Sequence, residues 1–109
     1  MNFIRGMIVV GTGKGGFSSK PRPFLIVQSD LFADHDTLTA CPLTSVISAT
    51  HLLRITLKAS PETGLMRDSE IQIDKIQMLR RDEIAKTIGT IPITTMTSVD
   101  DALRRWLEL

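Results

Sequence analysis

The fold of this chain is decided by one uninterrupted apolar stretch, Phe24-Leu25-Ile26-Val27, which the polar residues Gln28-Ser29-Asp30 follow. A strand with one face in water alternates apolar and polar residues, and this stretch does not alternate. It is therefore predicted to be a strand that is covered on both faces or that crosses the core of a small barrel. We expect the strand to end near Asp30.

Other stretches before and after it also carry strand-like residues, over 7–10, 38–45, 53–57 and 70–78. Pro42 interrupts the second of these, and because proline cannot donate a backbone hydrogen bond it marks an edge strand or a bulge. Residues 70–78 alternate, so that Ile71 and Ile73 share one face and Gln72 and Asp74 the other. We expect the two polar side chains to face outward or into a site.

Helices are predicted after the strands. Residues 81–88 are compatible with a short helix that Gly89 ends, since glycine suits the left-handed position after a helix. An amphipathic helix is predicted at the C-terminus with Ser98 as its N-cap, and we assign Trp106 to its core-facing side rather than to a surface on which bases stack. The apolar residues at one-face spacing are Val99, Ala102, Leu103, Trp106 and Leu107. Together the elements predict a mainly β domain, a compact and strongly bent antiparallel sheet or small barrel with packed helices.

The composition is that of an ordinary globular domain, because 42% of the 109 residues are hydrophobic and 23% are charged. A single hydrophobic core suits this length, so we expect one domain over residues 1–109. The formal net charge of +1 excludes a protein that coats nucleic acid through overall basicity. Any contact with RNA or DNA must come from a local cluster of charges.

The cysteine, the histidines and the apolar runs exclude further classes of protein. The single cysteine, Cys41, cannot form an internal disulfide, and with two histidines the chain has no residues at zinc-ligand spacing. No apolar run is long enough to cross a bilayer, and Arg5 and Gly6 interrupt the first one, so a signal-peptide layout is not expected. We expect a cytoplasmic protein with no metal, no cofactor and no membrane association.

A glycine-rich segment, Gly11-Thr12-Gly13-Lys14-Gly15-Gly16, formally matches the dinucleotide-binding pattern G-x-G-x-x-G. That pattern requires a helix directly after it, and Pro21 and Pro23 forbid one close by. The phosphate-binding loop of nucleoside triphosphatases is excluded as well, because Lys14 is followed by glycine rather than by serine or threonine. We interpret the segment as a loop.

Three places carry side chains that suit chemistry on a phosphate or a proton. Prolines on both sides stiffen the backbone around Arg22, although a surface arginine paired with a carboxylate fits the spacing at least as well. Thr44 and Ser45 supply hydroxyls at the end of a strand, where they also suit local turns. His35, flanked by two aspartates, could shuttle protons, but such a loop histidine is more often simply solvated.

Several short motifs, in their order along the chain, are similar to those of the MazF/PemK toxins. They are Arg5-Gly6 before a strand, the glycine-rich loop, Arg22-Pro23-Phe24-Leu25-Ile26-Val27-Gln28, Pro42-Leu43-Thr44-Ser45, Asp68-Ser69, Ile76-Gln77-Met78 and the C-terminal amphipathic helix. The arginine-proline and the threonine-serine steps are the specific parts. The resemblance implies an SH3-like barrel of bent antiparallel strands, a homodimer, cleavage of single-stranded RNA at short sequences, and neutralisation by a cognate antitoxin protein.

The resemblance also implies site residues. It assigns catalysis to Arg22 and Thr44, which we expect to lie close together across adjoining strands. It adds Asp74, although the arginine that some members carry two residues earlier is Gln72 here. Met7 replaces the usual acidic residue after the opening Arg-Gly, which bears on the contacts that set sequence preference. The candidate RNA contacts are Lys14, Lys20, Ser45, Gln72 and His35.

The chemistry that the family implies suits these residues. RNA carries its own nucleophile, the 2′-hydroxyl, so an enzyme needs only to align it, move protons and stabilise charge on the phosphate. Arg22 is always charged and suits charge stabilisation, while the hydroxyls of Thr44 and Ser45 can donate to a nonbridging oxygen or orient the attacking group. Proton transfer stays open between Asp74, His35, Arg22 and water.

Two other functions are compatible with such a fold. A gyrase poison binds a protein and cleaves nothing, but those toxins depend on a C-terminal Trp-Gly-Ile, whereas this chain has Trp106-Leu107-Glu108-Leu109. A noncatalytic SH3-like binding module would use Arg22 only as a ligand contact, and fold alone does not separate it from an enzyme. A neighbouring gene for a small protein with an acidic tail would favour the toxin.

Overall fold

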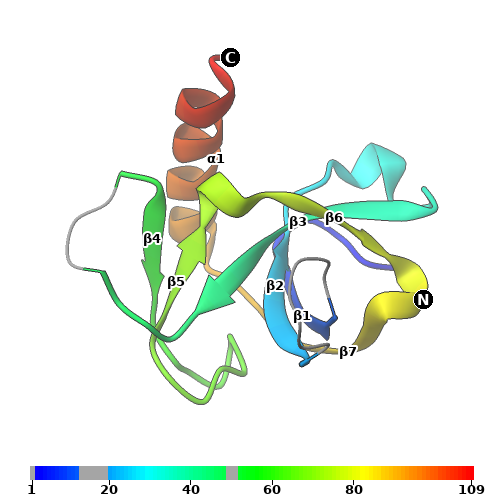
Figure 1. Cartoon of the computed structure of the whole chain (residues 1–109), viewed down its shortest axis with the longest axis horizontal. Helices are drawn as coiled ribbons and strands as arrows, with labels where there is room; N and C mark the ends of the chain where they lie inside the picture. The colour runs from blue at the N-terminus through cyan, green and yellow to red at the C-terminus, as the bar shows by residue number, and fades with distance from the viewer. Residues whose placement is uncertain (1, 13–19, 49–51) are drawn as a thin grey trace.

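The computed structural model describes residues 2–12, 20–48 and 52–109, and these form one bent antiparallel sheet with a helix beside it (Figure 1). The strands are β1 (Met7–Gly11), β2 (Arg22–Ile26), β3 (Thr37–Thr44), β4 (Arg54–Leu57), β5 (Ser69–Gln72), β6 (Gln77–Arg80) and β7 (Ile84–Thr90). The helix is α1 (Ile93–Leu107), and single turns of 3-10 helix are η1 (Asp30–Phe32), η2 (Ile73–Lys75) and η3 (Arg81–Glu83). The strand order is β4-β5-β3-β2-β1-β7, with β6 paired to β3. The predicted mainly β fold with a C-terminal helix is confirmed, and its sheet is open.

The bend of the sheet comes from β3, which changes its partner along its length. Its first half pairs with β6, where Ala40 opposes Gln77, and its end pairs with β5, where Leu43 opposes Ile71. Ala40 and Leu43 are three residues apart in β3, but their partners Gln77 and Ile71 are six residues apart. The extra residues between β5 and β6 form η2, which acts as a large bulge. The prediction of one alternating strand over 70–78 is wrong for this reason.

Pro42 lies at this change of partner and not on an edge strand. It opposes Phe24 in β2, whereas on the other side of β3 the pairs stop at Ala40 and resume at Leu43. A residue without a backbone N–H fits here because neither β5 nor β6 pairs with it. Of the two predicted explanations for this proline, the irregularity is confirmed and the edge strand is wrong.

The apolar strand β2 is covered on both faces, as predicted. The helix-side core comprises Ile8, Leu25, Val27, Cys41, Leu43, Leu57, Ile71, Ile73, Ile91, Val99 and Ala102. The sheet-side core comprises Phe3, Val9, Phe24, Ile26, Leu38, Ala40 and Leu79. Along β2, Leu25 points into the first core and Phe24 and Ile26 into the second. Because each fully buried side chain of this size contributes about 1.5–3 kcal/mol, the strand that begins with Arg22 is firmly held.

Residues 81–88 do not form one helix: a single 3-10 turn, η3, is followed directly by β7, so the prediction of a helix that Gly89 ends is wrong. Gly89 does not end a helix but lets a second backbone come close. A Cβ atom at Gly89 would lie 2.3 Å from the carbonyl oxygens of both Glu62 and Thr63. Beside it, the amide of Thr90 donates to the Glu62 carbonyl oxygen at 2.9 Å. The glycine therefore marks the place where the loop between β4 and β5 rests on β7.

α1 begins at Ile93, directly after Pro92, and the predicted N-cap Ser98 lies inside the helix. Its apolar face reaches the helix-side core through residues such as Val99. Trp106 is 46% exposed, so its assignment to the core is wrong. Within the described part of the chain, no helix is long and apolar enough to cross a membrane.

Candidate active site

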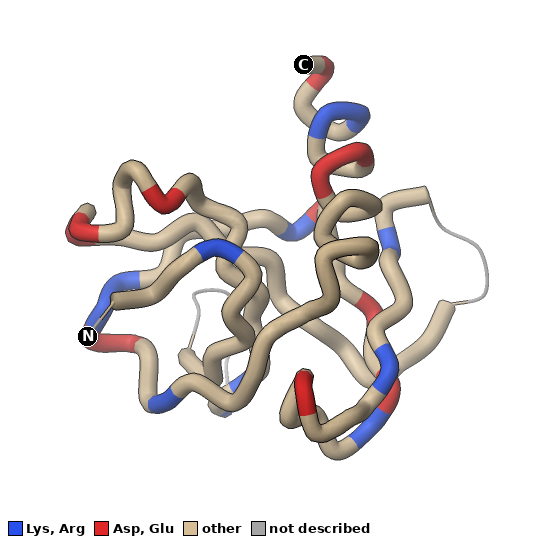
Figure 2. Tube along the Cα trace, turned by 180° about the vertical axis from the view of Figure 1, so that it is seen from behind, with Lys and Arg blue, Asp and Glu red and all other residues tan. Residues whose placement is uncertain are grey.

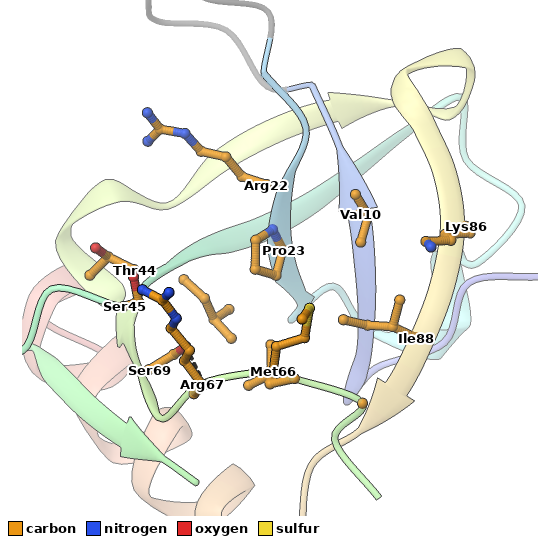
Figure 3. A pocket seen from close by; sticks show the side chains of 13 residues that line it. Val10, Arg22, Pro23, Thr44, Ser45, Met66, Arg67, Ser69, Lys86 and Ile88 are labelled. Atoms are coloured by element: carbon orange, nitrogen blue, oxygen red, sulfur yellow. Dashed lines mark hydrogen bonds between the residues drawn. The ribbon is translucent and has the colours of Figure 1, made fainter. Parts of the chain in front are cut away.

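A cavity of about 590 Å³ opens where β2 begins, β3 ends and the loop between β4 and β5 passes β7 (Figure 3). Its volume is within the range of sites that hold small ligands. Three of the predicted site residues, Arg22, Thr44 and Ser45, line it together.

The register of β2 and β3 explains why Arg22 and Thr44 come to the same cavity. Phe24 opposes Pro42, and continuing this antiparallel register by two residues sets Arg22, the first residue of β2, opposite Thr44, the last residue of β3. Their side chains line the same cavity, as expected for the ends of adjoining strands.

The hydroxyls of the cavity are only partly used by the protein. The Thr44 hydroxyl oxygen accepts from the Val46 amide at 3.1 Å, which is the local turn that the sequence also suggested. That bond leaves the hydroxyl proton free to be donated. Ser45 is exposed beside it, while the buried Ser69 donates its hydroxyl to the Arg67 carbonyl oxygen at 3.0 Å.

Two further cations line the cavity, Arg67 from the loop between β4 and β5 and Lys86 from β7. Neither was among the site residues predicted from the sequence. In Figure 3 the Arg67 side chain extends toward Thr44 and Ser45, and Arg22 lies on the other side of that pair. Among the described residues, no carboxylate lines the cavity, and no salt bridge or side-chain hydrogen bond engages these three cations. Unpaired positive charges that line one cavity together with hydroxyls suit an anion such as a phosphate.

The sequence contained a signal for only one of these two cations. Ile84, Lys86 and Ile88 are spaced two residues apart, as side chains on one face of a strand are. The helix predicted from Gly89 hid this signal. Arg67 lies in a loop with no periodicity. Only its position across from β3 brings it to the site.

The loop that carries Arg67 is packed tightly on β7. Gly64 has a φ of +69°, and a Cβ atom there would lie 2.0 Å from the Ile88 carbonyl oxygen. Thr63 is buried, and its hydroxyl oxygen accepts from the Ser60 amide at 3.1 Å. Because backbone contacts of this kind leave the loop little freedom, Arg67 is presented to the cavity from a fixed support.

Asp74 and Gln72 do not line the cavity. Asp74 lies in η2, where its carboxylate oxygens accept from Nε of Arg54 at 3.0 Å and from Nη2 at 3.2 Å. These hydrogen bonds, together with the positive charge of Arg54, hold the pKa of Asp74 below its ordinary value of 3.8. Gln72 is buried in β5 opposite Arg54, so the prediction that it faces outward or into a site is wrong.

His35 also lies away from this cavity. With Gln28, Phe32, Thr37 and Thr39 it lines a separate cavity of about 460 Å³. Its Nδ1 accepts from the Thr37 amide at 3.3 Å, and Nε of Arg81 donates to its carbonyl oxygen at 3.0 Å. The histidine thus belongs to a braced loop on another part of the sheet.

The remaining predicted RNA contacts are both lysines. Lys20 is exposed two residues before Arg22 and is not among the lining residues of the cavity. Lys14, with most of the glycine-rich segment, falls within 13–19 and lies outside the described residues.

Charges elsewhere on the molecule are mixed. Figure 2 shows Lys and Arg interspersed with Asp and Glu along the trace, in keeping with the net charge of +1. The three cations of the cavity are therefore a local feature. Over residues 2–12, 20–48 and 52–109, no three His, Cys, Asp or Glu side chains are grouped so that they could hold a metal ion.

Comparison with known proteins places this fold and sequence in one group. The chain is 35% identical over 105 residues to a probable endoribonuclease MazF of Mycolicibacterium smegmatis, with 96% of each chain covered. An endoribonuclease solved with its cognate antitoxin from a mycobacterial species superposes with a TM-score of 0.78 at 24% identity, over 97% of this chain and 95% of that one. MazF of Deinococcus radiodurans superposes with a TM-score of 0.80 at 21% identity, over 100% of this chain and 99% of that one.

A family model also matches almost the whole chain. Residues 5–107 fit the model described as PemK-like, MazF-like toxin of type II toxin-antitoxin system. The match spans every strand and the helix, and it includes all residues that line the cavity. This protein therefore belongs to the PemK-like, MazF-like family of toxins from type II toxin–antitoxin systems.

Proposed function

We propose that this protein is a toxin that acts as a metal-independent endoribonuclease on single-stranded RNA, as a single domain over residues 1–109. The observation that carries the proposal is the cavity at Thr44, where Arg22, Arg67 and Lys86 are unpaired and no carboxylate is present among the described lining residues. A magnesium-dependent nuclease needs carboxylate ligands for its metal, and the described lining residues supply none. The activity named for the curated relatives supports the same conclusion.

The reaction starts from the substrate's own 2′-hydroxyl. Its oxygen forms a bond to the adjacent phosphorus while the bond to the 5′-oxygen of the next nucleotide breaks, which leaves a 2′,3′-cyclic phosphate and a 5′-hydroxyl. Negative charge grows on the nonbridging oxygens during this step, and Arg22 stabilises it through its planar fork of donors. The Thr44 hydroxyl donates a hydrogen bond to one of these oxygens, while its own oxygen still accepts a hydrogen bond from the Val46 amide.

Two protons must move in this reaction, one away from the 2′-hydroxyl and one to the departing 5′-oxygen. No histidine, aspartate or glutamate lines the described part of the cavity. Asp74 is paired with Arg54, and its lowered pKa makes it a weak base. We therefore propose that water exchanges both protons and that Asp74 has a structural role.

The partners are proposed from the site and the family. A solved relative is described in complex with its cognate antitoxin, and an antitoxin of this chain would place an acidic segment over the cations of the cavity. A homodimer and a cytoplasmic location complete the proposal. Light scattering at micromolar concentration tests the dimer, because a stable monomer would contradict it. Displacement of RNA by the antitoxin tests the shared surface.

The cleavage proposal is tested on purified protein with a long RNA in excess chelator. We expect discrete cuts whose fragments end in 2′,3′-cyclic phosphate or 3′-phosphate. Arg22→Ala and Thr44→Ala should each lower the rate by on the order of a hundredfold to a thousandfold. Arg22→Lys should not restore the rate, because an ammonium lacks the planar fork. A folded Arg22→Ala protein that cuts as fast as the parent would overturn the site.

A further inference from the structure

We propose that the cavity is a nucleotide subsite in which Arg67 is a second phosphate-binding guanidinium, across from Arg22, and Met66 carries the base. The inference rests on the proposed function, because it assumes that RNA occupies the cavity. It assigns substrate contacts to two neighbouring residues of the loop between β4 and β5.

Arg67 has the position of a ligand-binding residue. Its side chain extends toward Thr44 and Ser45 in Figure 3, and in the described part of the chain no carboxylate neutralises it. Arg22, the first residue of β2, lines the same cavity. A phosphate beside Thr44 would accept from two planar donor forks, which match its oxygens in geometry as well as in charge.

The backbone at Arg67 is fixed before a ligand binds. The Ser69 hydroxyl donates to the Arg67 carbonyl oxygen at 3.0 Å, and the carboxylate of Asp68 accepts from the Ala59 amide at 2.8 Å. Gly64 seats the same loop on β7. A donor on a fixed backbone loses less conformational entropy on binding, so a larger part of its interaction energy with the phosphate contributes to affinity.

The wall beyond these cations is apolar and suits a base. It is formed by Pro23, Leu65, Met66 and Ile88. Met66 is 97% exposed, although methionine is normally buried, and Figure 3 shows it extending toward Pro23 and Ile88. The polarizable thioether suits contact with the flat face of a nucleobase. Lys86 carries only donors, so it favours a base edge that presents acceptors.

The first experiment measures binding to a mixed-sequence single-stranded DNA, which keeps the phosphates but lacks the 2′-hydroxyl. Arg67→Ala and Arg67→Lys are compared with the control Lys58→Ala, which removes an exposed charge from the same loop outside the cavity. Each phosphate contact on a single strand contributes about 0.7 to the slope of log affinity against log salt. We expect Arg67→Ala to lower this slope by about 0.7, and the other two variants to keep it.

The second experiment measures cleavage of RNA, with circular dichroism to verify each fold. Arg67→Ala should slow cleavage by on the order of a hundredfold, Arg67→Lys should recover only part of this, and Lys58→Ala should cut like the parent. Met66→Ala should slow cleavage by at least about fivefold, the value of a weak base contact. Replacing the base by an abasic residue on one side of the cut should abolish that difference.

The outcomes separate this inference from the proposed function. An Arg67→Ala protein with the parent's salt slope and rate refutes the phosphate contact, while the function stands if the parent cuts and Arg22→Ala does not. A Met66→Ala effect that persists on both abasic substrates refutes the base contact. A parent protein that cuts no RNA refutes the function, and the DNA-binding slopes then still decide whether Arg67 binds phosphate.

Discussion

Replacing Asp74 by asparagine separates a structural residue from a catalytic one. Asp74 joins η2 to β4 through two hydrogen bonds with Arg54, and the two side chains are only 22% and 16% exposed. Asp74→Asn keeps the shape but removes the charge and one of the two acceptors. We expect a less stable protein that still cuts RNA at the parent's rate at temperatures where it is folded.

The expected loss of stability follows from this geometry. Hydrogen bonds that involve charged groups contribute about 1.5–3 kcal/mol, and a partly buried bidentate pair should be near the middle of that range. A loss of about 2 kcal/mol lowers Tm by about 9 °C for a chain of 109 residues. The exposed pair of Arg80 and Asp82 is the control, since Asp82→Asn should change stability little.

The same pair predicts a pH dependence. Because Arg54 lowers the pKa of Asp74 in the folded state, the pair stabilises the protein fully above the ordinary value of 3.8 and loses this effect as the pH falls through the folded-state pKa. The difference in unfolding free energy between parent and Asp74→Asn should therefore be present at pH 7 and shrink below about pH 4.

Urea unfolding at equal protein concentration measures the stability, and a single-turnover assay measures cleavage. An Asp74→Asn protein as stable as the parent but a hundredfold slower would refute this reasoning and make Asp74 part of the reaction. Equal stability at pH 7 with an unchanged rate would show that the pair contributes nothing.

Three further predictions concern other parts of the fold. Gly89→Ala should cost about 1–3 kcal/mol in urea unfolding and slow cleavage, because its Cβ displaces the loop that carries Arg67; a parent-like rate would contradict this. Burial raises the pKa of Cys41 from 9.0 to about 12, so a thiol reagent at pH 8 should react only after denaturant is added. Asp100→Asn should lower stability by about 1 kcal/mol, since it weakens the ion pair with Arg5; an unchanged urea midpoint would count against it.

Much of the site's frame could be predicted from sequence. Arg22 and Thr44 begin and end consecutive strands, and in an antiparallel pair such ends meet. Asp74 could not be placed in this way. Its surroundings depend on the bulge at η2, which turns it toward Arg54. The alternation of residues within 70–78 does not reveal that this segment is longer than the part of β3 it faces.

The sequence by itself determined the elements whose residue pattern follows from their burial. These are β2, which is apolar because both of its faces are covered, and the amphipathic helix α1. The tertiary structure alone decided the state of residues 81–88, because the glycine at 89 is required by a loop that is distant in sequence. It also brought Arg67 and Lys86 to the cavity from separate segments. The physical reason is that local pattern encodes how deeply a segment is buried, whereas the backbone that comes to lie opposite it depends on the rest of the chain.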